Sequence, residues 1–143
     1  MSFQHDAGAY ITSRAGITPA TTTDGSEQEC LWVGHVGFRS AKLVVLCAAT
    51  LGDAETLTAT INWQDATDGS GTAAADYGTP YTATVVQTGT GSAEPVITIE
   101  LDVDLVTARG FIMAQVTLTP SSTGTLAWGA IYLLSGGEAN PVS

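Results

Sequence analysis

The chain has 143 residues, 44% of them hydrophobic, so it is long enough to fold as one domain around a buried core. Fourteen acidic residues against four basic ones give a formal net charge of −10. That charge argues against nucleic-acid and anionic-membrane partners, because both require a basic surface. The sequence also shows no secretory signal and no membrane-spanning apolar run, so we expect a protein made in a reducing cytoplasm.

Residues 1–28 differ in composition and pattern from the rest of the chain. Ser, Thr, Ala and Gly dominate this segment, and the large apolar residues Phe3, Tyr10, Ile11 and Ile17 are isolated in it. No helical or strand period is sustained. We therefore expect an extended N-terminal arm, which packs along its own domain or along a neighbouring subunit.

Residues 29–137 carry the pattern of a β-rich domain. Alternating polar and apolar residues place one set of side chains toward a core and the other toward solvent, whereas strands that are apolar on both faces are typically central or form interfaces. The alternating segments are Thr56–Trp63, Tyr81–Val86, Val96–Val103 and Ile112–Leu118, and the two-sided apolar segments are Leu43–Ala49 and Trp128–Leu134, with Leu31–Phe38 similar to them. These segments and their Gly-, Ser- and Thr-rich turns predict an all-β fold, a single antiparallel β-sandwich or jelly-roll-like domain, with an exposed tail at 138–143.

A long connection is expected over Gln64–Pro80, where Asp, Gly and Thr follow the alternating run. Long loops are often contact sites, so its polar and aromatic residues form a candidate contact loop. The candidate residues are Asp65, Asp68 and Tyr77 in this connection and Tyr81 directly after it. A shorter connection, Asp104–Arg109, could form one helical turn with Asp104 as its N-cap and Gly110 just past its end.

This connection fails as an EF-hand calcium loop. Placing Gly69 at the position that EF-hands reserve for glycine leaves Gln64, Ala66 and Ala75 at ligand positions. Another calcium site, formed by Asp65, Asp68 or Asp76, stays open as an alternative. The favoured interpretation is a connection without a metal.

The remaining polar residues do not form a catalytic pattern. Glu100, Asp102 and Asp104 share one face of a strand, which favours a solvated face over a cation site or a glycosidase acid pair. Cys30 and His35 stand at an odd spacing that sends them to opposite faces of a strand, which disfavours a nucleophilic dyad. We expect a non-enzyme without cofactor or metal.

The two cysteines, Cys30 and Cys47, do not make a disulfide framework. We expect two buried thiols inside strands, although the sequence leaves a bond between them open.

Three segments resemble small β-rich structural proteins of tailed phages, in particular head decoration (cement) proteins. They read TLTATINWQDATDGSGTAAADYG, ITIELDVDLVTARGFIMAQVTLTPSSTGT and AIYLLSGG, within residues 28–137. The resemblance implies a β-sandwich or jelly-roll body that assembles as a homotrimer on the exterior of the capsid. There it would clamp neighbouring major capsid proteins, and the arm would supply capsid contacts. The candidate contact residues of the arm are Phe3, Tyr10, Ile11, Arg14 and Ile17.

Two other functions remain open. One is a tail or head-completion protein of a phage, which would form sixfold or twelvefold rings. The other is a carbohydrate-binding β-sandwich module on the virion surface, which would use Tyr77, Tyr81 or the Asp65–Asp76 loop. Aromatic residues could also form a sugar platform, but on strands they are more often part of the core; the residues concerned are Trp32, Trp63, Trp128, Tyr77 and Tyr81.

Overall fold

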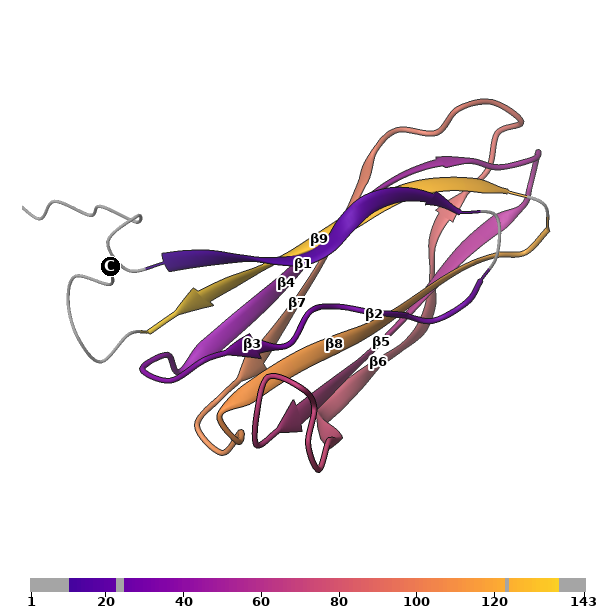
Figure 1. Ribbon diagram of the computed structural model, residues 1–143. Coiled ribbons are helices and arrows are strands. Elements are labelled where there is room, and N and C mark those ends of the chain that lie inside the picture. The colour runs from indigo at the N-terminus through magenta and orange to yellow at the C-terminus, as the bar shows by residue number, and fades with distance from the viewer. Residues whose placement is uncertain (1–10, 23–24, 123, 137–143) are drawn as a thin grey trace, which may run out of the picture.

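The computed structural model describes residues 11–22, 25–122 and 124–136 (Figure 1). The regular structure in these ranges is entirely β, which confirms the predicted all-β fold, and no helix in them could cross a membrane. The strands are β1 (Ile11–Thr22), β2 (Gln28–Glu29), β3 (Val33–Gly34), β4 (Ser40–Thr50), β5 (Thr56–Ala66), β6 (Ala75–Thr88), β7 (Ile97–Asp104), β8 (Phe111–Pro120) and β9 (Thr125–Ser135).

Two antiparallel sheets pack face to face as a β-sandwich. The first sheet has the order β1-β9-β4-β7, and the second has the order β2-β8-β5-β6, with β3 also paired to β8. Figure 1 shows β1 and β9 in one layer and β8, β5 and β6 in the other. Edge strands of the two sheets therefore lie on both sides of the sandwich, with β6 and β7 at one open edge.

The alternating segments lie where the pattern predicts. In β5 the residues Leu57, Ala59, Ile61 and Trp63 are buried, and in β7 the apolar residues face inward while the acidic residues are exposed. The two-sided apolar segments lie in β4 and β9, which are the central strands of the first sheet. Central strands have neighbours on both edges, so their position agrees with the expectation.

Residues 11–22, expected in the N-terminal arm, belong to the sandwich as edge strand β1. Ile11 pairs with Ser135 and Thr22 with Leu126, with two irregularities of register between these ends. Gly16 permits the close approach, because a Cβ there would lie 2.8 Å from the Ala130 carbonyl oxygen. Residues 11–22 thus pack along their own domain, which is one of the two arrangements expected for the arm. Phe3, Tyr10 and the predicted tail at 138–143 lie outside the described residues.

The long loop expected over Gln64–Pro80 is instead a β-hairpin, so that prediction is wrong. Strand β5 continues to Ala66 and β6 begins at Ala75, which leaves a connection of residues 67–74. The polar residues are strand residues here, with Gln64 opposite Asp76 and Asp65 opposite Ala75. The proline of β6, Pro80, lies between the paired residues Tyr77 and Tyr81, at an irregularity of register on an edge strand, where proline is tolerated.

Residues 104–109 form a turn rather than helix. Asp104 Oδ1 accepts a hydrogen bond from the Val106 N–H (2.9 Å), and the Leu105 carbonyl accepts one from the Ala108 N–H (3.1 Å). Asp104 thus caps the turn as predicted for an N-cap, but the chain enters β8 at Phe111 before a helix can form.

A tyrosine links the two sheets through the core. Tyr132 of β9 packs against Trp63 of β5, with ring centroids 6.0 Å apart, and its hydroxyl oxygen accepts a hydrogen bond from the Ala114 N–H of β8 (2.9 Å). Ala114 lies on β8 between the residues that pair with β2 and those that pair with β3, so neither strand supplies a ladder acceptor for its N–H. Burial raises the pKa of the Tyr132 hydroxyl, which therefore stays protonated.

Replacing Tyr132 with Phe should lower the free energy of unfolding by about 1–3 kcal/mol, because the buried Ala114 N–H loses its acceptor. Urea unfolding followed by fluorescence measures the change. Tyr81→Phe is the control, since Tyr81 is half-buried in β6 and should cost under about 0.5 kcal/mol. Equal losses in the two variants would contradict the role given to the Tyr132 hydroxyl.

The two cysteines are free thiols with exposed fractions of 3% at Cys30 and 0% at Cys47. Cys47 faces the core from β4, and Cys30 directly follows β2. The expected burial is confirmed, and it raises the pKa of both thiols from 9.0 to about 11.

The native protein should therefore react slowly with a thiol reagent such as a disulfide-exchange dye. At pH 8 the rise in pKa alone lowers the thiolate fraction about a hundredfold, and burial slows access further. Both thiols should react at the rate of a free cysteine in urea. Rapid native reaction of either thiol would contradict its described burial.

Candidate functional site

The outer surface of the first sheet is apolar at its centre. Outward positions of β4 and β9 face each other directly in the register: Val44 opposite Ile131, Leu46 opposite Gly129 and Ala48 opposite Ala127. The sequence produces this surface because β4 and β9 carry apolar residues at outward as well as inward positions. We call it the apolar face and define it as Val44, Leu46, Ala48, Val96, Ala127, Gly129 and Ile131.

A groove of about 300 Å³ runs over the apolar face, and Ile17 of β1 also contributes to its lining. Leu46, Ile131 and Val96 are 50%, 44% and 65% exposed. Large apolar side chains gathered in this way on an exposed surface mark a site of protein contact, whereas scattered ones do not. The apolar face is therefore the best candidate for an interface in the described structure.

A charged cluster borders the apolar face on one side. Lys42 of β4 lies beside the β7 carboxylates, 3.0 Å from Glu100 and 3.5 Å from Asp102. The hydrogen bond from Lys42 to Glu100 raises the pKa of the lysine ammonium. Ion pairs this exposed add little stability. The cluster marks the limit of the apolar face along β4, and the acidic residues of β7 are exposed as predicted.

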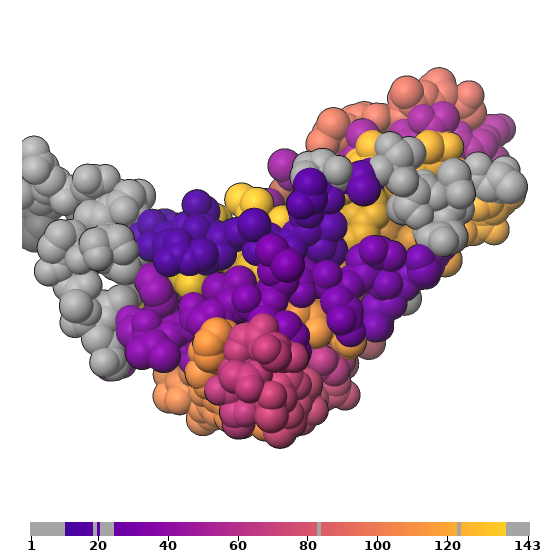
Figure 2. Space-filling model, in the orientation of Figure 1, coloured from indigo at the N-terminus to yellow at the C-terminus, as the bar shows by residue number. Residues whose placement is uncertain are grey.

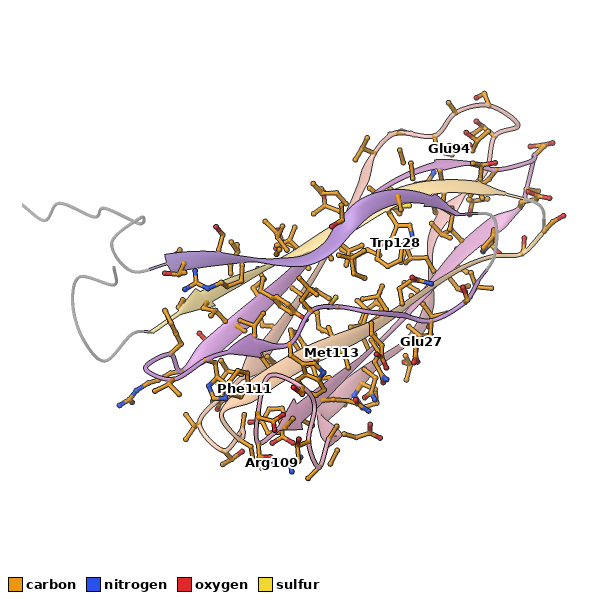
Figure 3. All side chains as sticks on the ribbon, viewed as in Figure 1. Glu27, Glu94, Arg109, Phe111, Met113 and Trp128 are labelled. Carbon is orange, nitrogen blue, oxygen red and sulfur yellow. The ribbon has the colours of Figure 1, made fainter. Side chains whose placement is uncertain are left out.

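Asp65, a predicted contact residue, is instead paired with Arg109 and only 6% exposed. Asp65 Oδ1 accepts hydrogen bonds from Arg109 Nε (3.0 Å) and Nη2, and Oδ2 accepts one from the Arg109 backbone N–H (2.9 Å). Arg109 also donates from Nη1 to the Ala73 carbonyl (2.7 Å) in the hairpin connection. Figure 3 shows Arg109 at the end of the sandwich where this connection lies.

The other two aspartates of this region also have internal partners. Asp68 Oδ1 accepts hydrogen bonds from the N–H groups of Ser70 (2.9 Å) and Thr72 (3.1 Å), which shapes the connection of residues 67–74 that projects in Figure 2. Asp76 accepts from the side-chain amides of Asn62 and Gln64. The Thr72 side chain, followed by the two backbone N–H groups, lowers the pKa of the Asp68 carboxyl, and the amides of Asn62 and Gln64 lower the pKa of the Asp76 carboxyl. No group of metal-ligating side chains able to hold an ion occurs in the described residues, so the calcium alternative gains no support.

The predicted aromatic residues are mostly internal. Tyr77 and Tyr81 are half-buried and pack against the core, and the Tyr77 hydroxyl donates to the Asp104 carbonyl (2.6 Å). Trp63 and Trp128 are buried, and Trp32 is half-buried, so they form no exposed sugar platform. Figure 3 shows Trp128 on β9, within the first sheet.

The described part of the predicted capsid-contact arm lies on β1. Ile11 and Arg14 are exposed near its start, and Ile17 is half-buried beside the groove. Sequence reasoning did not identify Arg109 or Val96 as site residues. A signal for Arg109 was available, because it is one of only four basic residues and directly follows a turn.

No family model matches the chain, and no curated protein sequence matches it. The fold, an antiparallel β-sandwich domain, is distantly similar to several solved structures. The structure of infectious bursal disease virus, Gx strain, is 12% identical with a TM-score of 0.47 over 92% of this chain and 34% of the viral one. CBM35 from Cellvibrio japonicus Abf62 is 16% identical, with a TM-score of 0.46 over 88% and 94%. Eiger TNF from S. frugiperda is 10% identical, with a TM-score of 0.43 over 94% and 97%.

This chain spans about a third of the length of the viral protein. These structural similarities are too distant to say what the chain binds. Any function must therefore be argued from its own residues.

Acid should destabilise the protein through Asp65. The Arg109 hydrogen bonds hold the pKa of Asp65 below its ordinary value of 3.8, so the unfolded chain binds a proton more readily than the folded one. The stabilisation is complete above the unfolded pKa and is lost as the pH falls through the folded pKa. Urea unfolding from pH 7 to pH 2 measures this loss.

At pH 7 the free energy of unfolding of the variant Asp65→Ala should be about 3 kcal/mol lower than that of the wild type. It should also decrease less steeply than the wild-type value as the pH falls. This figure is at the low end for breaking a buried ion pair, because the Arg109 side chain is 35% exposed. The double variant Asp65→Ala/Arg109→Met should lose less than the sum of its single variants. Additive losses would refute a coupled pair.

Proposed function

We propose that this chain is a structural protein of a virion, without enzymatic activity, that attaches to the outside of a tailed-phage capsid. As a homotrimer it would join neighbouring major capsid proteins and so stabilise the shell. The observation that carries this proposal is the apolar face, because Leu46 and Ile131 of the first sheet, with Val96 just before β7, are exposed where a solitary domain would place polar side chains. The resemblance to decoration proteins supplies the identity of the partner.

Charge supports a location outside the shell. A net charge of −10 with four basic residues would repel packaged DNA and would not adsorb to it. The basic residues are in part already engaged, since Lys42 contacts Glu100 and Arg109 is paired with Asp65. The surface thus suits attachment to protein.

Two surfaces would make the contacts in such an assembly. The apolar face would join copies of the chain, and β1 with the residues before it would reach the capsid. Ile11 and Arg14 are exposed on β1, which is an edge strand and can contact a second chain along its open side. Three such attachments in one trimer would bind more tightly than one, because each holds the others at high local concentration.

A charge placed on the apolar face should separate the copies. Light scattering of the wild-type protein should give a mass three times that of one chain, and Leu46→Asp should give the mass of a single chain. Val85→Asp is the matched control, because Val85 is 54% exposed on β6 of the other sheet and its replacement should leave the trimer intact. A monomeric wild-type protein would contradict the trimer.

Electron microscopy of virions that carry the chain tests its location. Density on the outside of the capsid at threefold or quasi-threefold positions is expected, whereas sixfold or twelvefold rings at the neck or tail would favour a head-completion or tail protein. Deleting residues 2–10 leaves β1 in place and tests the first part of the arm alone. The truncated protein should bind heads less tightly, and unchanged binding would remove these residues from the contact.

A further inference from the structure

Two β-turns at one end of the sandwich display valines at their corners. The turn of residues 35–38 is closed by a hydrogen bond between its ends (2.9 Å) and has Val36 at its second position. The turn of residues 105–108 is closed in the same way (3.1 Å) and has Val106 at its second position. Val36 is 85% exposed and Val106 is 68% exposed. Because turns mostly carry Gly, Pro, Asn, Asp or Ser, two exposed valines at equivalent corners call for an explanation.

The two turns are bonded to each other. The Leu105 N–H donates a hydrogen bond to the Arg39 carbonyl, directly after the first turn (2.8 Å). The His35 N–H donates to the Gly110 carbonyl (3.1 Å), and His35 Nε2 lies 2.6 Å from the Arg109 carbonyl oxygen. Figure 1 shows both turns at the end of the sandwich where the β5–β6 connection also lies. These contacts hold both valines on one fixed base, so little ordering is needed when a partner binds.

Ile11 and Arg39 extend the surface next to the valines. Ile11 pairs with Ser135 of β9, and the Arg39 N–H donates to the carbonyl of the same serine (3.1 Å). Ile11 is 41% exposed, and Arg39 is exposed as well. We call the surface formed by Ile11, Val36, Arg39 and Val106 the turn patch. None of its residues belongs to the apolar face.

The charges of the chain are distributed unevenly between the two ends of the sandwich. All four basic residues lie toward the end that carries the turn patch, each near the start of a strand; they are Arg14, Arg39, Lys42 and Arg109. The connections at the opposite end contain Asp53, Glu55 and Glu94 and no basic residue. The negative charge of the chain is thus partly compensated at one end only.

Two carboxylates of β7 near the turn patch have partners within the chain. Asp104 Oδ1 accepts a hydrogen bond from the Val106 N–H (2.9 Å), and Asp102 lies 3.5 Å from Lys42. The net charge of −10 repels an acidic surface from the chain as a whole. Such a surface can therefore approach most readily at the turn patch, where Arg39 is exposed.

We propose that the turn patch docks on the major capsid protein, with Val36 and Val106 in an apolar depression and Arg39 beside a carboxylate of that protein. The inference rests on the proposed virion role and names the surface that meets the shell. Apolar side chains next to an arginine on a fixed backbone are typical of the residues that dominate protein interfaces. An anionic membrane is disfavoured by the net charge.

The position of the turn patch agrees with the assembly proposed above. Strand β1 begins at this end, so the patch is continuous with the contact proposed for β1. In a cyclic trimer every copy presents the same end to the same side. With the apolar faces around the axis, the turn patches of all copies can therefore bind one shell together, which raises the affinity of the whole trimer.

Binding of the full-length protein to heads assembled without it tests the apolar part of the patch. Val36→Ser and Val106→Ser should each weaken binding about tenfold, because each removes a valine that becomes buried on docking. Serine suits a turn, so both variants should fold. Val85→Ser is the matched control, since Val85 is 54% exposed on β6, outside the patch, and its replacement should leave the affinity unchanged. Light scattering should give each variant the mass of the wild type.

A series at Arg39 tests the acidic character of the partner. Arg39→Lys keeps the charge and should bind nearly as the wild type, whereas Arg39→Glu should bind at least about tenfold more weakly, because two carboxylates would then face each other. Circular dichroism and light scattering check the fold and the mass of both variants. Equal affinity of the Lys and Glu variants would refute an acidic partner at this position.

The outcomes separate this inference from the virion role. If the wild type fails to bind heads, the virion role fails and the inference with it. If the wild type binds, and Val36→Ser and Val106→Ser bind equally well, the turn patch is excluded as the contact and the virion role stands. Sedimentation with neutral phosphatidylcholine vesicles that requires both valines would assign the patch to a membrane and would also overturn the inference.

Discussion

The buried pairing of Asp65 with Arg109 organises one end of the sandwich. Through a single side chain, Arg109 joins the end of β5, the hairpin connection at Ala73 and the start of β8. Its carbonyl oxygen is also 2.6 Å from His35 Nε2, next to β3. Ala73 has a φ of 56°, a left-handed conformation that costs about 1 kcal/mol, and the bond from Arg109 helps to hold it there. A buried carboxylate is tolerated because both of its oxygens are satisfied, and removal of either partner would leave a charge without compensation.

The hairpin that this pair anchors sets the shape of the neighbouring edge. With the β5–β6 connection fixed at residues 67–74, β6 starts in register with β5 at Ala75, and the surplus residues of β6 must bulge at Gly78. Tyr77 then reaches across to the end of β7, where its hydroxyl bonds to the Asp104 carbonyl. The shape of this edge is thus a consequence of the register between β5 and β6.

The alternation of polar and apolar residues along the chain was enough to predict the strands whose partners are close in sequence or whose two faces differ in polarity. It predicted the inward residues of β5 and β7, and the two-sided apolar runs predicted the central strands β4 and β9. Alternation could not predict β1, because its pairing with β9 joins opposite ends of the chain and its own residues show no strand period. It also failed for Gln64 and Asp65, polar residues that are strand members because Asp76 and Arg109 satisfy them. The bulge in β6 and the contact from Tyr77 to Asp104 depend on strand pairing and packing, which no local pattern contains.

The two outer faces of the sandwich provide an internal comparison that bears on the apolar face. The second sheet covers its outer surface with polar side chains, among them Thr60 and Asn62 on β5 and Gln115 and Thr117 on β8, paired directly with one another. The first sheet has the same architecture, yet it places Leu46 opposite Gly129 and Val44 opposite Ile131. A β-sandwich therefore does not require apolar residues on its outer surfaces, because the second sheet of this chain carries polar residues there. Because exposed apolar side chains bring aggregation without adding to the core, their concentration on one sheet is best explained by a partner that covers it.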